Sequence, residues 1–280
     1  MAASVSARRR PGLAPGSGWQ IGVLAAVGAV VLGLPVAVLV GRAVLGGKLT
    51  HALGLRPVVD ALALSLATTA ASLAVTILIG LPLALALARR SFRGSTILET
   101  VIDLPIVLPP SVAGLALLLL LGRRGLLGEQ LSAVGLEIPF TTLAVVVAQT
   151  FVSAPFFIRS ARSGFAAVDP DLQDAARVDG ASERQVFTAI IVPLAAPALT
   201  AGMVMSWARS LGEFGATIMF AGNLPRRTQT LPLVVYGEFQ SGDLDASIAA
   251  AALLVLAAFG VLVAVRLLRW GRVLDVRAIA

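Results

Sequence analysis

Residues that commonly carry covalent or metal chemistry are scarce in this chain. Its 280 residues include no cysteine and a single histidine, His51. Disulfides, thiolate metal sites and cysteine nucleophiles are therefore excluded, and a multi-histidine metal site is impossible within one chain. The acids are scattered and do not cluster with histidine. The sequence thus predicts no metal or cofactor site and argues against a membrane enzyme.

The sequence also lacks the means to hydrolyse ATP. A phosphate-binding loop requires G-x-x-x-x-G-K-[ST]. The only Gly-Lys pair is Gly47-Lys48, which Leu49 follows, and Arg42 occupies the place of the first glycine. Any ATP that drives this protein must be hydrolysed by another polypeptide, so we expect the chain not to be an enzyme.

Two groups of polar residues remain that can act on a partner or a solute. One is an acidic stretch over residues 169–183, which contains Asp169, Asp171, Asp174, Asp179 and Glu183. The other is the pair Arg209 and Glu213, whose spacing of four allows an ion pair on one face of a helix if the helix persists that far. What either group can do depends on the elements that carry it.

Most of those elements are apolar enough to lie in lipid. Hydrophobic residues make up 58% of the chain, charged residues 13%, and the mean hydropathy is +0.92. A soluble domain has about 45–50% apolar and about 25% charged residues. A membrane span needs roughly 20 apolar residues. Six segments meet or approach this length, which predicts an all-α integral membrane protein with six transmembrane helices: Trp19–Val40, Ala61–Ala88, Ile97–Leu121, Phe140–Ile158, Leu194–Leu211 and Ala246–Leu268.

Two apolar stretches are irregular. Pro105, Pro109 and Pro110 predict that the third span is kinked or broken, and its freed backbone groups need protein or water partners. Asp103 is costly against lipid, so we expect it to face the bundle or the cytoplasmic interface. Phe214–Gly222 is too short to cross and is predicted to be a re-entrant or interfacial piece.

The net charge of +7 is explained by membrane topology. With six spans, fourteen of the 22 Lys and Arg residues fall on the side of the termini, and eight fall on the other: Arg42, Lys48, Arg56, Arg123, Arg124, Arg209, Arg226 and Arg227. The positive-inside rule then places both termini in the cytoplasm. We expect short tails at residues 1–18 and 269–280 around a membrane domain of residues 19–268, and no nucleic-acid partner.

The longest predicted cytoplasmic loop, Arg159–Thr188, has the signals of two short helices. Asp169 is a good N-cap with Pro170 at the first helical position, and Gly180 is suited to a left-handed C-cap. Ser182 to Gln185 form a capping box, and Pro193 is expected to disturb the helix that follows. Five apolar positions are predicted to share one helical face: Phe165, Val168, Leu172, Ala175 and Ala176.

Three interpretations of this loop are possible. It can be a capped interfacial loop, a DNA-binding helix-turn-helix, or a docking surface for a cytoplasmic partner. About 30 tethered residues are too few for a DNA-binding core, and the five acids would repel phosphate. Small residues such as Ala175 allow close approach to a partner, which favours docking over the plain loop.

The same residues carry a resemblance to a known family. Asp174-Ala175-Ala176, then Gly180, then Ile190, Val192 and Pro193 resemble the EAA loop of importer-type ABC permeases in every spacing. The departures are Asp174 in place of glutamate and Val192 in place of leucine. The resemblance implies that residues 159–192 form a coupling loop seated on an ATP-binding subunit. The residues it assigns to that role are Leu172, Asp174, Ala175, Ala176, Asp179, Gly180, Phe187 and Pro193.

The resemblance also implies an assembly. It suggests two copies of this chain around one pathway, two copies of an ABC ATP-binding subunit, a periplasmic or extracellular oxyanion-binding protein, and the inner membrane of a bacterium or archaeon. Two other stretches, Leu104–Leu115 and Ala208–Asn223, resemble the oxyanion branch, and the second is most like the molybdate permeases. Sulfate permeases share the Glu-Phe-Gly core at Glu213, and tungstate permeases cannot be separated from molybdate permeases.

A tetrahedral dianion needs hydrogen-bond donors that do not trap it. The candidate pathway or gate residues are Ser111, Arg209, Glu213, Phe214 and Thr217. For Arg209 and Glu213 a gate and a simple structural pin are both open, and Phe214 is more readily explained by packing. Arg226 and Arg227 can meet an acidic rim on a binding protein or be an ordinary solvated pair.

The rival from another class is a secondary anion transporter that needs no ATPase. Such proteins normally carry ionisable residues deep in several spans and often have inverted repeats. The predicted spans are nearly free of charge apart from Asp103 and the terminal Arg209, and no repeat is visible in the sequence.

Overall fold

A computed structural model describes residues 18–89 and 93–277, and the regular elements in this part of the chain are all helices. The N-terminal arginines Arg8, Arg9 and Arg10, and Arg90, lie outside it. The elements in chain order are α1 (Gly18–Leu45), α2 (Lys48–Gly54), α3 (Arg56–Arg89), α4 (Ser95–Val107), α5 (Pro110–Leu121), α6 (Gly128–Ala133), α7 (Thr142–Ala166), α8 (Pro170–Val178), α9 (Glu183–Gln185), a π-helical segment (Val186–Ile191), α10 (Val192–Leu211), α11 (Gly215–Ala221), α12 (Leu231–Ser241) and α13 (Leu244–Arg277).

Five of these helical stretches are long and apolar enough to cross a membrane, and the pair α4 and α5 makes a sixth if it is counted as one broken span. This confirms the predicted all-α membrane architecture. The break is at Leu108 and Pro109, whose ψ angles are both 133°, and the two helices are bent by 117°. A residue before proline avoids the helical region, so the adjacent prolines end α4 and start α5 in a new direction.

The helices extend beyond the predicted spans where polar residues find partners. The fourth span runs on to Ala166 and so includes Arg159 and Arg162, which are predicted from the sequence to lie in the loop. Arg162 pairs with Glu99 of α4 at 2.8 Å, and Arg159 approaches Asp103 at 3.7 Å. Asp103 therefore faces the bundle, as expected. The fifth span also begins early, at Glu183.

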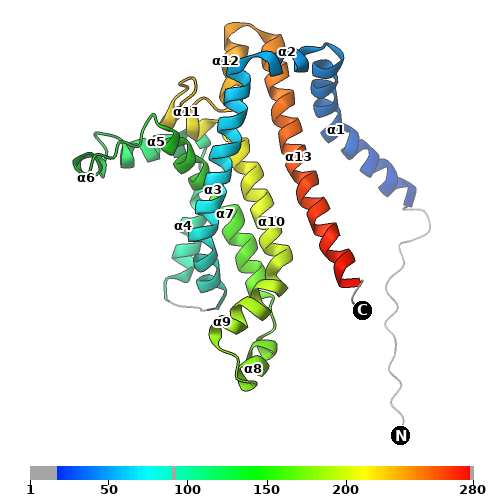
Figure 1. Ribbon diagram of the computed structural model, residues 1–280, viewed down its shortest axis with the longest axis vertical. Helices are drawn as coiled ribbons and strands as arrows, with labels where there is room; N and C mark the ends of the chain where they lie inside the picture. Colours follow the sequence, from blue (N-terminus) through cyan, green and yellow to red (C-terminus); the bar gives the residue numbers. More distant parts are fainter. Residues whose placement is uncertain (1–17, 90–92, 278–280) are drawn as a thin grey trace.

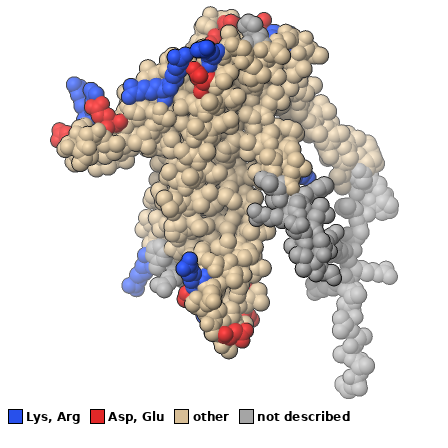
Figure 2. All heavy atoms as spheres, in the orientation of Figure 1, with Lys and Arg blue, Asp and Glu red and all other residues tan. Residues whose placement is uncertain are grey.

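Most of the charged residues that are visible in Figure 2 lie at the two ends of the molecule, and other residues dominate the belt between them. The helix α8 marks one end, and α2 and α12 lie at the other (Figure 1). The first residues of α1 and the last of α13 point toward the α8 end. An even number of crossings requires this, and the uncharged belt is what a bilayer requires of a surface in contact with it.

The centre of the fold is a three-helix group of α3, α7 and α10. A buried hydroxyl seam joins these helices: Ser210 donates to Ser153 at 2.9 Å, and the hydroxyls of Ser72 and Ser210 lie 3.2 Å apart. Thr150 donates to Ser72 at 3.2 Å. Hydroxyl pairs of this kind hold helices together in lipid, where apolar burial provides little drive.

Gly202 lets α10 approach α7 closely. A Cβ at this position would lie 2.8 Å from the Cβ of Ser160 and 3.2 Å from the carbonyl oxygen of Phe157. Both neighbours belong to the rigid helix α7, so a larger residue forces the helices apart.

We expect Gly202→Val to lower the free energy of unfolding by about 1–3 kcal/mol, the usual cost of overpacking a close contact. The measurement is thermal unfolding of the purified protein in detergent. Gly260→Val is the matched control, because a Cβ on Gly260 meets open space in this subunit. Equal shifts for the two variants would show that the α7–α10 contact is not tight.

The helix α1 stands apart from this centre and contacts α2 and α13 (Figure 1). The small residues predicted to allow close helix contact, Ala25, Ala29 and Gly33, are all exposed in the single subunit. A Cβ added at Gly33 would have no neighbour within 4 Å in the subunit.

Candidate functional site

The helix α8 has the boundaries that the sequence predicts. Asp169 caps it by accepting a hydrogen bond from the backbone N–H of Asp171 at 2.9 Å, and Pro170 takes the first position. None of its residues is buried. Leu172 is 50% exposed and Val178 88% exposed, which is unusual for apolar side chains at the polar end of the molecule. The helix therefore presents an apolar surface outward.

The predicted shared apolar face is only partly present. Phe165 and Val168 are buried in the bundle, whereas Leu172 and Ala175 are exposed. The prediction is wrong because the helix does not continue from α7 into α8: Asp169 has a ψ of 124°, which breaks the helical period. Ala176 lies against the bundle core, so Leu172 and Ala175 remain free for a partner.

Gly180 makes the turn after α8. Its φ is +90°, in the left-handed region, as its predicted role requires. Its N–H donates to the carbonyl of Arg177 at 3.0 Å, and the N–H of Ala181 donates to that of Ala176 at 2.9 Å. These bonds close the last turn of α8. The next helix then opens with the predicted capping box between Ser182 and Gln185.

Pro193 disturbs the winding of the helix after the capping box, as expected, but does not break the helix. It runs without a break from Glu183 to Leu211, because residues Val186–Ile191 are wound as a π-helix. In this wider turn the N–H of Val192 donates to the carbonyl of Phe187, five residues back. The helix therefore continues through Pro193, which has no backbone N–H to donate. Phe187 packs against Phe165 of α7 with ring centroids 6.4 Å apart.

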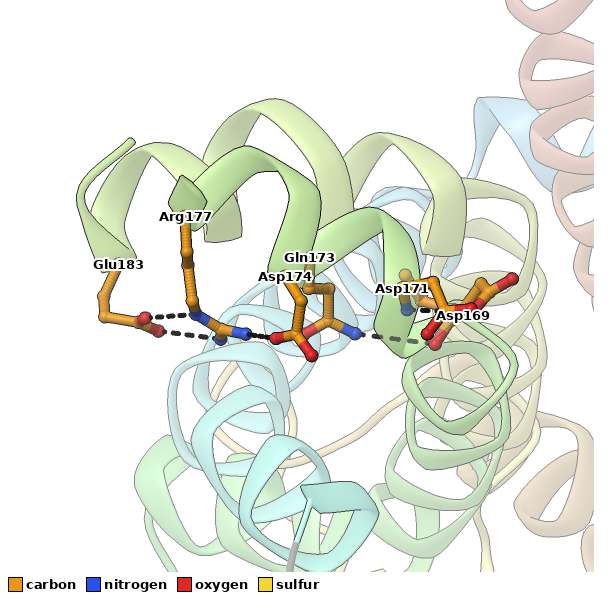
Figure 3. A network of polar contacts seen from close by, with 7 residues as sticks. Asp169, Asp171, Gln173, Asp174, Arg177 and Glu183 are labelled. Atoms are coloured by element: carbon orange, nitrogen blue, oxygen red, sulfur yellow. Dashed lines mark hydrogen bonds and ion pairs between the residues drawn. The ribbon is translucent and has the colours of Figure 1, made fainter. Parts of the chain in front are cut away.

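A network of ion pairs crosses the Gly180 turn (Figure 3). Nε and Nη2 of Arg177 donate to the two carboxylate oxygens of Glu183 at 2.6 and 3.2 Å, and Nη1 donates to Asp174 at 2.6 Å. The bonds to Glu183, and then the bond to Asp174, raise the pKa of Arg177 above its ordinary value. Sequence reasoning did not find this network, although the acids at three residues before and six after Arg177 were a signal of it.

The second group of candidates lies where α10 gives way to α11. Nη1 of Arg209 lies 2.7 Å from Oε2 of Glu213, so the predicted pair forms even though α10 ends at Leu211. Glu213 is 1% exposed, and its Oε1 accepts a hydrogen bond from the N–H of Ala216 at 2.7 Å. The carboxylate thus ties α10 to the start of α11. Phe214 packs on Tyr236 of α12, with ring centroids 4.9 Å apart.

The broken span brings Ser111 to the same place. A Cβ on Gly215 would lie 2.7 Å from the Cβ of Pro110, so α11 sits directly against the start of α5. Ser111 is exposed there, whereas Thr217 is fully buried and its hydroxyl has no partner among the described residues. Ser111 thus lies at the α5–α11 contact, and Thr217 is part of α11. Glu213 joins Arg209 to the start of α11, and Phe214 packs toward α12.

The opposite end of the molecule from α8 has its own ion pairs. Arg226 contacts Asp60 of α3 at 3.0 Å, and the two residues line one hollow together with Arg56. Arg123 contacts Glu137 at 2.6 Å. Arg227 makes no ion pair within the described part of the chain, although its carbonyl accepts a hydrogen bond from Thr142. The side chain of Arg226 is therefore held by Asp60, and that of Arg227 is the more available of the two to a binding protein.

Residues 77–270 match the family described as the binding-protein-dependent transport system inner membrane component. The chain belongs to this family. Its membership makes it a transport permease subunit of an ABC importer in a membrane. The EAA-like loop around α8 lies within the matched residues, as do the pathway candidates.

The relatives with a name are molybdenum and sulfate transport permeases. The permease is 48% identical over 157 residues to the putative molybdenum transport system permease YvgM of Bacillus subtilis, covering 56% of this chain and 69% of that one. It is 44% identical over 198 residues to the molybdenum transport permease ModB of Mycobacterium tuberculosis, covering 71% and 75%. The sulfate transport permease CysT of Escherichia coli is 37% identical over 186 residues, covering 66% and 67%.

Solved structures confirm the fold. A bacterial ABC transporter that imports the polysaccharide alginate has a chain with a TM-score of 0.70 and 15% identity, covering 89% of this permease and 93% of that chain. An amino acid ABC transporter gives a TM-score of 0.54 and 19% identity, covering 76% and 92%. The importer-type permease fold expected from the α8 loop is therefore confirmed.

Proposed function

We propose that this permease moves molybdate, or a tetrahedral oxyanion of the same charge and shape, as one of two copies that form the pathway between them. The observation that carries the proposal is the identity to two molybdenum transport permeases, which exceeds that to the sulfate transport permease. In this proposal each of two ATP-binding subunits binds α8 of one permease copy, and a binding protein delivers the anion to the opposite end.

The residues near the α5–α11 contact suit such an anion. Ser111 stands at the N-terminal end of α5, where a helix favours negative charge, and its hydroxyl is a neutral donor. Arg209 is held by Glu213, so the pair has no net charge. A free arginine would bind a dianion too tightly, whereas a neutralised pair and hydroxyls provide sites that it can leave.

The coupling residues connect α8 to the spans that carry this region. The chain runs from α8 through Gly180 directly into the helix that ends at Leu211, between Arg209 and Glu213. In the proposed cycle, closure of the ATP-binding subunits moves α8, and the fourth and fifth spans rock as a rigid body to open the site outward. Both termini lie in the cytoplasm in this proposal, on the same side as α8.

Substrate competition tests the proposed cargo. Proteoliposomes with the complete importer should take up labelled molybdate, and unlabelled molybdate or tungstate should reduce the uptake far more than equal sulfate. Stronger competition by sulfate than by molybdate would reassign the permease to sulfate. No uptake of any of the three anions by an importer that hydrolyses ATP would reject an oxyanion as the cargo.

A further inference from the structure

The fold leaves α8 weakly attached to the bundle. It has nine residues, too few for a stable isolated helix, and none is buried. Its apolar anchors are Val168 just before it, Ala176 within it and Ala181 after it. All three are small or lie at the ends of the helix, so apolar packing alone leaves its angle to the bundle poorly fixed.

The turn at Gly180 is a second source of freedom. Glycine is the residue with the widest choice of backbone angles, and open space surrounds it here. When a partner moves α8, the helix can therefore rotate about this turn without moving the fifth span. The backbone bond from Ala181 to Ala176 bridges the turn next to Gly180 only. Firm transmission also requires a side-chain contact that reaches from α8 to the helix after the turn.

Arg177 makes that contact. Its guanidinium reaches across the turn to both oxygens of Glu183, the first residue of the fifth span, and binds Asp174 one turn earlier on α8 (Figure 3). The two-oxygen contact fixes direction as well as distance, which a single-point ammonium cannot do. The guanidinium of Arg177 thus joins α8, before the Gly180 turn, to the helix that follows the turn.

We infer that Arg177 is the positioning residue that fixes the angle between α8 and the fifth span, so that movement of α8 is passed on to α10. This inference rests on the proposed function, because it assigns Arg177 a part in passing the partner's movement to the pathway. It adds a residue to which neither the resemblance nor the relatives assign a role. Asp174 keeps a second carboxylate oxygen, which leaves it able to meet the partner while it is bound to Arg177.

The first test measures geometry in the permease alone. The chain has no cysteine, so spin labels can be placed at Val178→Cys on α8 and Leu194→Cys on α10, which are 88% and 53% exposed. The full chain in lipid should show one narrow distance between the labels, and Arg177→Met should broaden it. The matched control is Arg184→Met, since Arg184 is an exposed arginine of the same loop with no ion pair among the described residues. A distribution as narrow in Arg177→Met as in the parent would overturn the inference.

The second test measures coupling in the complete importer. With Arg177→Met we expect the ATP-binding subunits to remain associated, ATP hydrolysis to continue, and anion transported per ATP to fall about tenfold. The exchanged pair Arg177→Glu with Glu183→Arg should recover most of the ratio, because the guanidinium then starts from the fifth span and can bind both carboxylates on α8. Loss of association, an unchanged ratio, or no recovery in the exchanged pair would each overturn the inference.

The two tests separate this inference from the proposed function. If the unaltered importer transports no oxyanion, the proposed cargo fails, while the distances still report whether Arg177 fixes α8. If the unaltered importer transports molybdate and Arg177→Met behaves like the Arg184→Met control in both tests, the cargo stands and the positioning role fails.

Discussion

Replacing Gly180 by valine is expected to reduce ATP-driven uptake by the importer strongly. The φ of +90° lies in the left-handed region, which costs an L-residue about 1–2 kcal/mol and a β-branched one the most. Because about 1.4 kcal/mol is a factor of ten in an equilibrium, the substitution shifts the Gly180 turn about tenfold toward rearranged conformations that carry α8 away from its position. Uptake of labelled anion should fall at least about tenfold, and co-purification of the ATP-binding subunits should fall with it.

Asparagine at the same position separates backbone conformation from contact with the partner. Asparagine tolerates the left-handed region, and the space around Gly180 within the subunit is open. If the turn alone matters, Gly180→Asn keeps most of the uptake. If Gly180→Asn loses as much as Gly180→Val, the partner sits directly against this glycine. Full uptake by Gly180→Val would contradict a coupling role for the α8 loop.

Glu213→Gln is the second large effect that we expect. Glutamine can still accept the hydrogen bond from Ala216, but it loses the charge that pairs with Arg209. Breaking a buried pair costs about 3–5 kcal/mol. Arg209 is 30% exposed, so solvent screens part of this and we expect a loss of about 1–3 kcal/mol in unfolding free energy. Thermal unfolding in detergent measures it.

A surface pair provides the matched control. Arg123 and Glu137 also make a contact of 2.6 Å, but their side chains are 74% and 53% exposed. Glu137→Gln should therefore change the unfolding free energy by only about 0–1 kcal/mol. Equal effects of the two substitutions would mean that the Glu213 pair is as solvated as the surface one.

The same variant distinguishes a gate from a structural pin. Proteoliposomes loaded with labelled molybdate and given no ATP should retain the anion if the Arg209–Glu213 pair only holds α11 on α10. Faster efflux through Glu213→Gln than through the parent would identify the pair as part of the closed gate. Arg209→Met combined with Glu213→Gln should then leak no more than either single variant, since both break one contact.

The features predicted correctly from the sequence depend on neighbours within a few residues. Asp169 caps α8, Gly180 takes a left-handed turn, and Pro109 and Pro110 break the third span, because caps, positive φ and proline act locally. The pairing of Arg209 with Glu213 is also local, at a separation of four residues.

The features that were missed depend on residues far apart in the chain or on a choice between helical windings. Arg159 and Arg162 belong to α7 because Asp103 and Glu99 of α4, distant in the sequence, neutralise them. The hydroxyl seam joins Ser72 to Ser210 across 138 residues. The π-helical segment Val186–Ile191 contains no glycine or proline that would indicate a change of helical winding. The missing apolar contacts of Leu172 and Ala175 follow from the single extended residue Asp169.

In the proposed function, this chain moves an oxyanion only when another polypeptide that is bound to α8 hydrolyses ATP. The direct test is uptake of labelled molybdate into proteoliposomes that contain the permease with its ATP-binding subunits and binding protein, compared with the permease alone under an imposed ion gradient. Uptake should require the ATP-binding subunits and ATP, and it should be lost in Gly180→Val. Gradient-driven uptake by the permease alone, unaffected by that substitution, would contradict the account and identify a secondary transporter.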